Sequence, residues 1–139
     1  EMNNKLGCIC LAMKILETEQ KLITERDLGL KFVSKSRKID TIPFMLINIE
    51  TQKPFTVYYK GIATPYFRLE KMNEETCCAV LSPLEAIDMD GNAVELCETV
   101  YSLKKTDKCI IVVLSCFCAI NPLPPELVNK PLPSIEPKC

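Results

Sequence analysis

The chain has 139 residues, of which 47% are hydrophobic and 25% are charged, and its formal net charge is −1. This composition is ordinary for a folded globular protein and excludes a disordered chain, while the length favours one domain with a sizeable core. A net charge so close to zero excludes long-range attraction to nucleic acid or to an anionic membrane.

Residues 1–27 are predicted to form an N-terminal arm with one amphipathic helix. Hydrophobic side chains recur at helical spacing at Ile9, Ala12, Met13 and Leu16. Cys8 and Cys10 lie in the first turn and differ by about 200° around the helix axis, so they do not face together. The N-terminus of a helix lowers the pKa of a thiol, which makes the thiolate more available. For either cysteine alone, a role as a small core residue is equally open.

Residues 28–121 are predicted to form an antiparallel β-sandwich built from short strands separated by turns. Alternating patterns indicate strands at residues 43–49, 55–59, 66–70 and 76–81. The inward positions of the second and third strands are Phe55, Val57, Tyr59, Phe67 and Leu69. Because adjacent strand residues face opposite sides, Cys77 and Cys78 must diverge, one toward the core and the other toward the surface or an interface.

Residues 88–92, Asp-Met-Asp-Gly-Asn, resemble the start of a calcium loop. The glycine comes too early for that loop, and no bidentate glutamate follows at the required spacing. Asp-Gly-Asn between apolar segments is instead a hairpin turn signal. We therefore predict a turn.

Two further strands are expected at residues 96–103 and 109–118. The first would place Cys97 in the core. The continuous Ile/Val run of the second indicates burial on both faces, so Cys109, like Cys97, is expected to be a buried thiol. Cys116 and Cys118 at its end would point the same way and could reach a partner strand, a metal or a neighbouring molecule.

Residues 122–139 contain six prolines and end in Cys139. This composition predicts an extended, polyproline-like arm. An arm that lies across its own or a neighbouring domain is the simplest interpretation, although a ligand for an aromatic-lined groove is also conceivable. A terminal cysteine on such an arm is placed to reach outside the parent domain.

Nine cysteines and no histidine limit the chemistry. A Cys-His pair and a Ser-His-Asp triad are both impossible, and neither a phosphate-binding glycine loop nor a thioredoxin-type C-x-x-C occurs. We therefore expect no enzyme activity and no cofactor. The alternative is a zinc-binding or redox-sensing module in which Cys8, Cys10, Cys116 and Cys118 form one four-thiolate site.

The compartment is predicted from the apolar segments. No signal peptide is visible near the start, and the longest apolar run, residues 109–120, is short of the roughly 20 residues that span a bilayer. We expect synthesis in a cytosol, where thiols usually stay reduced. The odd number of cysteines leaves at least one sulfur free, metal-bound or paired between molecules if the others oxidise within the chain.

Several short blocks resemble a family of cysteine-rich spore coat and exosporium proteins, the CotY/CotZ/ExsY family. They follow the family's order over roughly residues 8 to 128, at residues 8–10, 14–16, 40–44, 66–71, 77–81, 105–109, 116–120 and 125–128. Family cysteine positions match Cys8, Cys10, Cys77, Cys78, Cys97, Cys109, Cys116 and Cys118.

The resemblance implies a structural protein that is made in the mother-cell cytoplasm and deposited on the spore surface, in the coat or the exosporium. It further implies self-assembly into a two-dimensional, disulfide-crosslinked lattice with itself and other coat or exosporium proteins. The near-zero net charge and the short apolar runs argue against nucleic-acid partners and membrane insertion. Our hypothesis is a symmetric oligomer that tiles into a sheet. The best candidates for links between subunits are Cys8, Cys10, Cys118 and Cys139.

Overall fold

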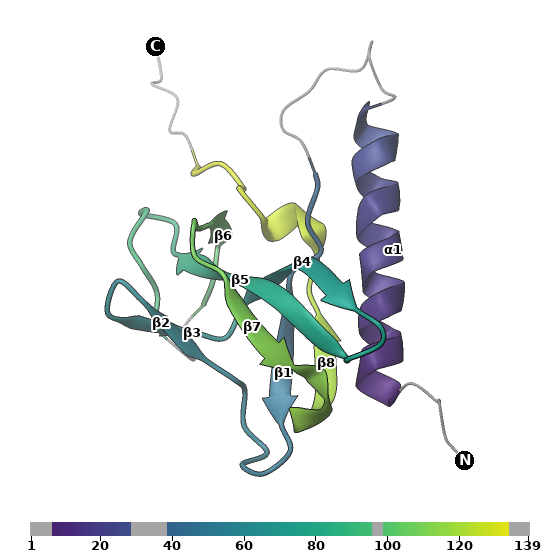
Figure 1. The fold of residues 1–139 in the computed structure, drawn as a ribbon. Coiled ribbons are helices and arrows are strands. Elements are labelled where there is room, and N and C mark those ends of the chain that lie inside the picture. The colour runs from purple at the N-terminus through teal and green to yellow at the C-terminus, as the bar shows by residue number, and fades with distance from the viewer. Residues whose placement is uncertain (1–6, 29–38, 96–98, 134–139) are drawn as a thin grey trace, which may run out of the picture.

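The computed structural model describes residues 7–28, 39–95 and 99–133. These residues form a mainly β structure with one N-terminal helix, α1 (Cys8–Leu28), and antiparallel strand pairs (Figure 1). The predicted fold class is confirmed.

Helix α1 covers the main sheet with the face predicted from its hydrophobic spacing. Met13 and Leu16 are buried in the main core cluster, and Ile9 packs against it. Cys8 is exposed whereas Cys10 is buried, as their separation around the helix axis requires.

The strands are β1 (Phe44–Asn48), β2 (Val57–Tyr59), β3 (Ile62–Thr64), β4 (Phe67–Asn73), β5 (Cys78–Ile87), β6 (Ser102–Lys105), β7 (Ile110–Val113) and β8 (Phe117–Pro122). The main sheet has the order β6-β5-β4-β1-β8, and β7 also pairs with β5. The first half of β5 pairs with β7 and the second half with β6, so two short strands share one edge of a long one. Strands β2 and β3 form a separate two-stranded sheet.

Phenylalanine side chains join the two sheets, and the predicted inward positions of four residues are confirmed: Phe55, Val57, Phe67 and Leu69. Phe67 and Leu69 of β4 are fully buried, and Phe55 and Val57 pack against the same cluster from the β2 side. The ring of Phe55 lies 5.4 Å from that of Phe67 and 5.3 Å from that of Phe117, measured between centroids. Aromatic contacts of this kind supply much of the apolar burial in a small core.

A second core cluster lies under the C-terminal segment. Val128, just after the short 3-10 helix η2 (Pro125–Leu127), is buried there with Leu84 and Leu103, and it forms a parallel bridge with Leu103. The hydroxyl of Ser102 donates to the carbonyl oxygens of Leu127 and Lys130. The described part of the proline-rich segment therefore lies across its own β6, in agreement with the simplest interpretation of its sequence.

The polar turn at residues 88–92 is confirmed. The carboxylate of Asp88 accepts hydrogen bonds from the backbone amides of Asp90 and Asn92. Gly91 has φ +88°, a conformation that side chains disfavour.

The strand predicted at residues 96–103 is only partly present. Strand β6 begins at Ser102, and residues 96–98, including Cys97, lie outside the described residues. The turn after Lys105 then leads to β7.

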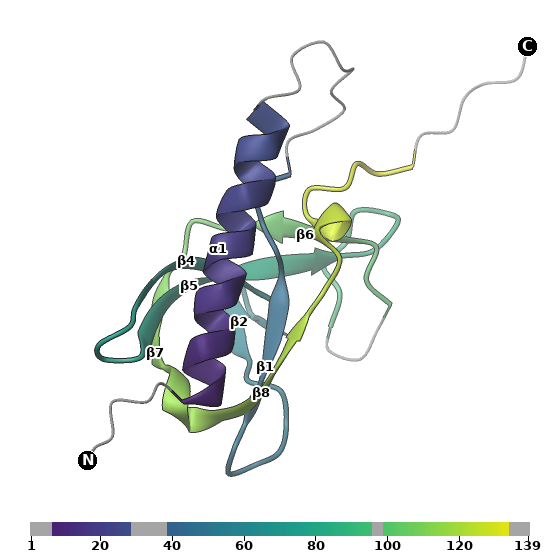
Figure 2. The same ribbon diagram turned by 90° about the vertical axis from the view of Figure 1, so that its right-hand side faces the viewer.

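The apolar run 109–118 is not one strand, and its predicted burial on both faces is wrong. The 3-10 helix η1 (Leu114–Cys116) divides it into β7 and β8 and carries the chain from the β5 side of the sheet to the β1 side (Figure 2). Ile111 is 76% exposed and Val113 is 47% exposed. Strand β7 lies at the sheet edge, where alternate side chains face outward while Val112 faces the core.

Candidate functional site

The cysteines are the candidate functional groups, and the structure separates them by exposure. Four thiols are exposed, and they lie at the start of α1, before β7, in η1 and in β8: Cys8, Cys109, Cys116 and Cys118. Two are half-buried, Cys77 and Cys78, and one is buried, Cys10. Cys97 and Cys139 lie outside the described residues.

Cys116 and Cys118 both lie beside the end of β1. The thiol of Cys118 donates to the carbonyl oxygen of Asn48 at 3.8 Å, and the amide of Ile49 donates to the carbonyl oxygen of Cys116 at 3.1 Å. Cys116 also lines a hollow of about 510 Å³ together with residues 48–51 and Ser115. A side chain from a second molecule therefore has room to approach this thiol.

Cys109 is exposed, so the prediction of a buried thiol is wrong here. It directly precedes the edge strand β7, and its sulfur lies 3.5 Å from the hydroxyl oxygen of Ser82 on the neighbouring β5. The expected burial assumed a central strand, whereas edge strands leave side chains in solvent.

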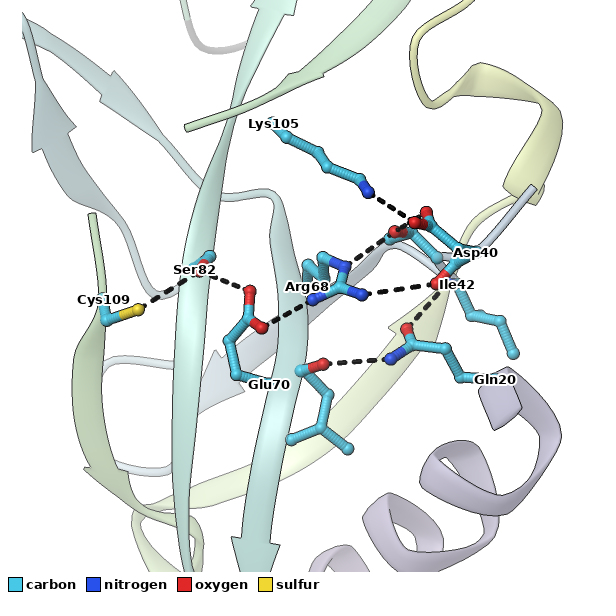
Figure 3. Close-up of polar contacts among 10 residues, drawn as sticks. Gln20, Asp40, Ile42, Arg68, Glu70, Ser82, Lys105 and Cys109 are labelled. Atoms are coloured by element: carbon cyan, nitrogen blue, oxygen red, sulfur yellow. Dashed lines mark hydrogen bonds and ion pairs between the residues drawn. The ribbon is translucent and has the colours of Figure 1, made fainter. Parts of the chain in front are cut away.

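A chain of polar contacts runs from Cys109 across the sheet (Figure 3). Ser82 donates to Glu70 at 2.7 Å, and Arg68 bridges Glu70, at 2.6 Å, and the hydroxyl of Thr41, at 2.8 Å. Near its far end, Lys105 forms an ion pair of 2.6 Å with Asp40, which also accepts a hydrogen bond from Thr41. The network joins β4, β5, β6 and the segment before β1.

The two carboxylates of this network have lowered pKa values. Burial disfavours the charged form of Glu70, but hydrogen bonds from Ser82 and Arg68 outweigh that effect and lower its pKa. Burial likewise opposes ionisation of Asp40, and hydrogen bonds from Lys105 and Thr41 lower its pKa on balance. Both groups are therefore held as carboxylates.

Sequence reasoning missed this network, although part of its signal was visible. Arg68 and Glu70 alternate with the inward Phe67 and Leu69, which marks a polar face of the strand. Their partner Ser82 depends on strand register, since it lies opposite Arg68 with a bulge between Leu69 and Lys71. A single sequence does not reveal that register.

Gln20 of α1 joins the helix to the sheet at the same place. Its side-chain nitrogen donates to the carbonyl oxygen of Leu69 at 3.0 Å, and its side-chain oxygen accepts from the amide of Ile42 at 3.0 Å. Strands β1 and β4 pair at Phe44 and Phe67, and continuation of that antiparallel register would bring Ile42 opposite Leu69. The side-chain amide of Gln20 thus takes the place of direct backbone hydrogen bonds between Ile42 and Leu69.

Cys10 and Cys77 differ from the exposed thiols. Cys10 is 1% exposed, so its thiol cannot reach a second molecule in this conformation, and the expectation that it links subunits does not fit its burial. Cys77 packs against the main core cluster, where burial and then contact with the Cys10 thiol raise its pKa to about 12. Cys77 is thus the core-facing member of the adjacent pair, while Cys78 begins β5.

The structure does not assemble the alternative zinc site. Among the described residues, which include Cys8, Cys10, Cys116 and Cys118, no three cysteine or acidic side chains lie together as metal ligands would. Cys10 is enclosed beside Cys77, while the other three thiols are exposed.

Within the described residues, no helix has the length and apolar character required to cross a membrane. The fold and its thiols thus define a class: a small, mainly β, cysteine-rich protein with most of its described thiols at or near the surface.

Comparison with known proteins identifies the family within that class. The family model described as spore coat protein Z matches residues 16–125. Spore coat protein Z of Bacillus subtilis (strain 168) is 31% identical over 141 aligned positions, covering 89% of this chain and 93% of that protein. The chain belongs to the spore coat protein Z family, as the resemblance indicated. No solved structure matches significantly.

Family membership makes this chain a spore coat protein and places it on the spore surface. A coat protein has a structural role.

Proposed function

We propose that this protein is a non-enzymatic building block of the spore coat or exosporium that self-assembles into a two-dimensional lattice linked by disulfides between protomers. The observation that carries the proposal is the set of four exposed thiols, which are spread over α1, the edge of β7 and the η1–β8 segment. Because the thiols lie at several places on the surface of a molecule, each molecule can bond to more than one neighbour.

The thiols need a reducing compartment first and an oxidising one later. In the mother-cell cytoplasm they stay reduced, so molecules associate through noncovalent contacts. At the spore surface oxidation then forms the links. Each bond between two molecules raises the effective concentration for the next, so a few links make dissociation very slow.

Strand β7 offers apolar surface for the noncovalent step. Ile111 is 76% exposed and Val113 is 47% exposed, and both project from the outward face of an edge strand. Exposed apolar side chains gathered at a sheet edge favour contact with another protein surface.

The candidate links follow exposure. Cys8 and Cys118 remain from the sequence hypothesis, Cys109 and Cys116 join them because they are exposed, and Cys10 is left out because it is buried. Cys139 stays a candidate from its sequence position alone. Other coat and exosporium proteins with free thiols are the expected further partners.

Non-reducing electrophoresis after air oxidation tests covalent assembly. The wild-type protein should give a ladder of oligomers that collapses with reductant, and Cys116→Ser combined with Cys118→Ser should shorten that ladder. Cys10→Ser is the matched control, because a buried thiol contributes no link between molecules and its loss should leave the ladder unchanged. A single monomer band from the oxidised wild type would refute the crosslinked lattice.

Electron microscopy of the protein before and after oxidation tests the lattice itself. We expect ordered sheets whose resistance to dilution increases after oxidation. Irregular aggregates linked by disulfides would support crosslinking but contradict a two-dimensional lattice.

A further inference from the structure

One face of α1 is directed at the turn between β4 and β5. Cys10 and Lys14 are four residues apart, so they lie on the same side of the helix. The ammonium nitrogen of Lys14 lies 2.8 Å from a carboxylate oxygen of Glu74 in that turn. Cys77 follows three residues after Glu74, and in Figure 1 the turn between β4 and β5 runs beside α1.

Hydrogen bonds hold Cys77 in place on both sides. Its amide donates to the carbonyl oxygen of Asn73 at 2.8 Å, and its carbonyl oxygen accepts from the amide of Leu114 in η1 at 2.9 Å. The backbone of Cys77 has φ +59°, which residues with side chains adopt rarely. The surrounding contacts therefore fix the position of this residue.

Helix α1 packs on η1, and η1 is hydrogen-bonded to Cys77 through Leu114, so the side chains of Cys10 and Cys77 are brought into interaction range at this junction. Cys10 is 1% exposed, and Cys77 packs against the main core cluster that includes Met13 and Leu114. A reagent or a second molecule can reach Cys77 in part, but it cannot reach Cys10. The partner available to Cys10 in the folded chain is thus the neighbouring sulfur.

We propose that Cys10 and Cys77 are the site of an intramolecular disulfide that joins α1 to the β4–β5 turn when the protein is oxidised. This bond would be distinct from the links between protomers, because it lies inside each molecule. It does not depend on whether the protein forms a lattice.

The oxidant we assign to the reaction is a low-molecular-weight disulfide, RSSR. The deprotonated sulfur of Cys77 attacks one sulfur of RSSR, which breaks the S–S bond, forms a mixed disulfide and releases RS⁻. The deprotonated sulfur of Cys10 then attacks the sulfur of Cys77, forms the Cys10–Cys77 bond and releases the second RS⁻. The two protein thiols lose two electrons and two protons, and RSSR becomes two RSH.

The bond would connect segments 67 positions apart (77 minus 10) in the chain. Closing so long a loop restricts the unfolded chain and stabilises the folded state. We expect oxidation to raise the melting temperature of a protein of this size by on the order of 10 °C.

The experiment uses peptide mapping of the full chain oxidised with oxidised glutathione. Cleavage with trypsin gives a peptide of residues 6–14 that contains both Cys8 and Cys10. It also gives a peptide of residues 72–104 that contains Cys77, Cys78 and Cys97. The variant Cys8→Ser, Cys78→Ser, Cys97→Ser therefore gives each peptide one cysteine. Equal amounts of ¹⁵N-labelled and unlabelled protein are mixed before oxidation, so that the isotope pattern reports which molecule each peptide came from.

We expect the linked pair of residues 6–14 and 72–104 as light–light and heavy–heavy species only. Mixed heavy–light pairs would show a bond between molecules and overturn the proposal. Free Cys10 and Cys77 after oxidation of the exposed thiols would also overturn it. In the protein with all cysteines present, a Cys77–Cys78 bond would do the same.

The change in melting temperature on oxidation provides a second test, which remains valid even if a substitution alters the packing. Cys10→Ala and Cys77→Ala are each compared oxidised and reduced, so any cost of the substitution cancels within the variant. Both variants should lose the oxidation-dependent rise, and the control Cys116→Ala should keep it. A rise retained in Cys10→Ala would contradict the proposed bond, whereas loss of the oligomer ladder alone would contradict only the lattice.

Discussion

Gln20 donates from its side-chain nitrogen to the carbonyl oxygen of Leu69 at 3.0 Å, where β1 and β4 no longer pair directly. Its oxygen accepts a hydrogen bond from the amide of Ile42, and the residue is only 8% exposed. One helical side chain thus closes a gap in the sheet.

Gln20→Leu should strongly destabilise the protein. The leucine retains the bulk but leaves a buried amide and a buried carbonyl group without partners, which costs about 1–3 kcal/mol each. We expect the free energy of unfolding in urea to fall by about 2–4 kcal/mol. Glu19→Leu is the control on the exposed side of the same helix turn and should change it by less than about 0.5 kcal/mol. Equal effects of the two substitutions would contradict the bridging role of Gln20.

The Glu70 and Asp40 carboxylates predict acid sensitivity. Their pKa values in the folded protein lie below the ordinary values of 4.5 and 3.8, so the unfolded chain binds more protons in this range. The stability they contribute is complete above those ordinary values and is lost as the pH falls through the lower folded values. Urea unfolding midpoints from pH 6 to pH 2.5 should show this decline.

Arg68→Met should weaken the acid dependence, because it removes the cation that stabilises Glu70. Lys71→Met is the control, since it removes an exposed cation from the same strand. If both variants retain the wild-type slope below pH 4.5, the Arg68–Glu70 pair does not cause the decline.

Thiol alkylation should proceed in an order that the structure sets. Cys8, Cys109, Cys116 and Cys118 are exposed and should react first with iodoacetamide. Burial and the neighbouring Cys10 thiol raise the pKa of Cys77 to about 12, so its reactive thiolate is much scarcer at neutral pH than that of an ordinary thiol. Mass spectrometry should show its rate rising about tenfold per pH unit while the fold persists.

Alkylation in urea is the control for this order. There Cys10 and Cys77 should react as fast as the exposed thiols, because burial and their mutual contact are lost. Rapid modification of Cys77 in the folded protein at pH 7 would be inconsistent with its raised pKa.

The apolar face of β7 should promote association before any disulfide forms. Ile111→Thr keeps a β-branched residue on the strand, so stability should change by less than about 0.5 kcal/mol. Sedimentation under reducing conditions should then show weaker self-association. Tyr58→Thr, on an exposed side chain of β2, is the control and should leave association unchanged. A stronger effect of Tyr58→Thr would place the contact elsewhere.

Much of the fold could be predicted because local patterns agree with the final packing. The helical spacing around Met13, the inward positions Phe67 and Leu69, and the turn at residues 88–92 all depend on neighbours close in the chain. The run 109–118 failed because β7 and β8 pair with different strands, so its hydrophobic character does not reveal which face is covered.

The candidate site could be predicted less well than the fold. The cysteine positions alone indicated crosslinking, but they did not separate buried from exposed thiols. Cys10 meets Cys77 only when α1 packs on the β4–β5 turn, and Cys109 is exposed only because β7 lies at an edge. Such long-range packing leaves no periodic signal in a single sequence.

The course of the chain through η1 has a mechanical consequence. Cys109 directly precedes β7 and Cys118 is the second residue of β8, so a pull that separates these two sulfurs acts along β7 and η1. Strand β7 is paired with β5 over residues 110–113, so sliding it along β5 would load several backbone hydrogen bonds in parallel. A protein shell strained through these two positions would meet resistance in shear, because the β5–β7 seam could not open one bond at a time.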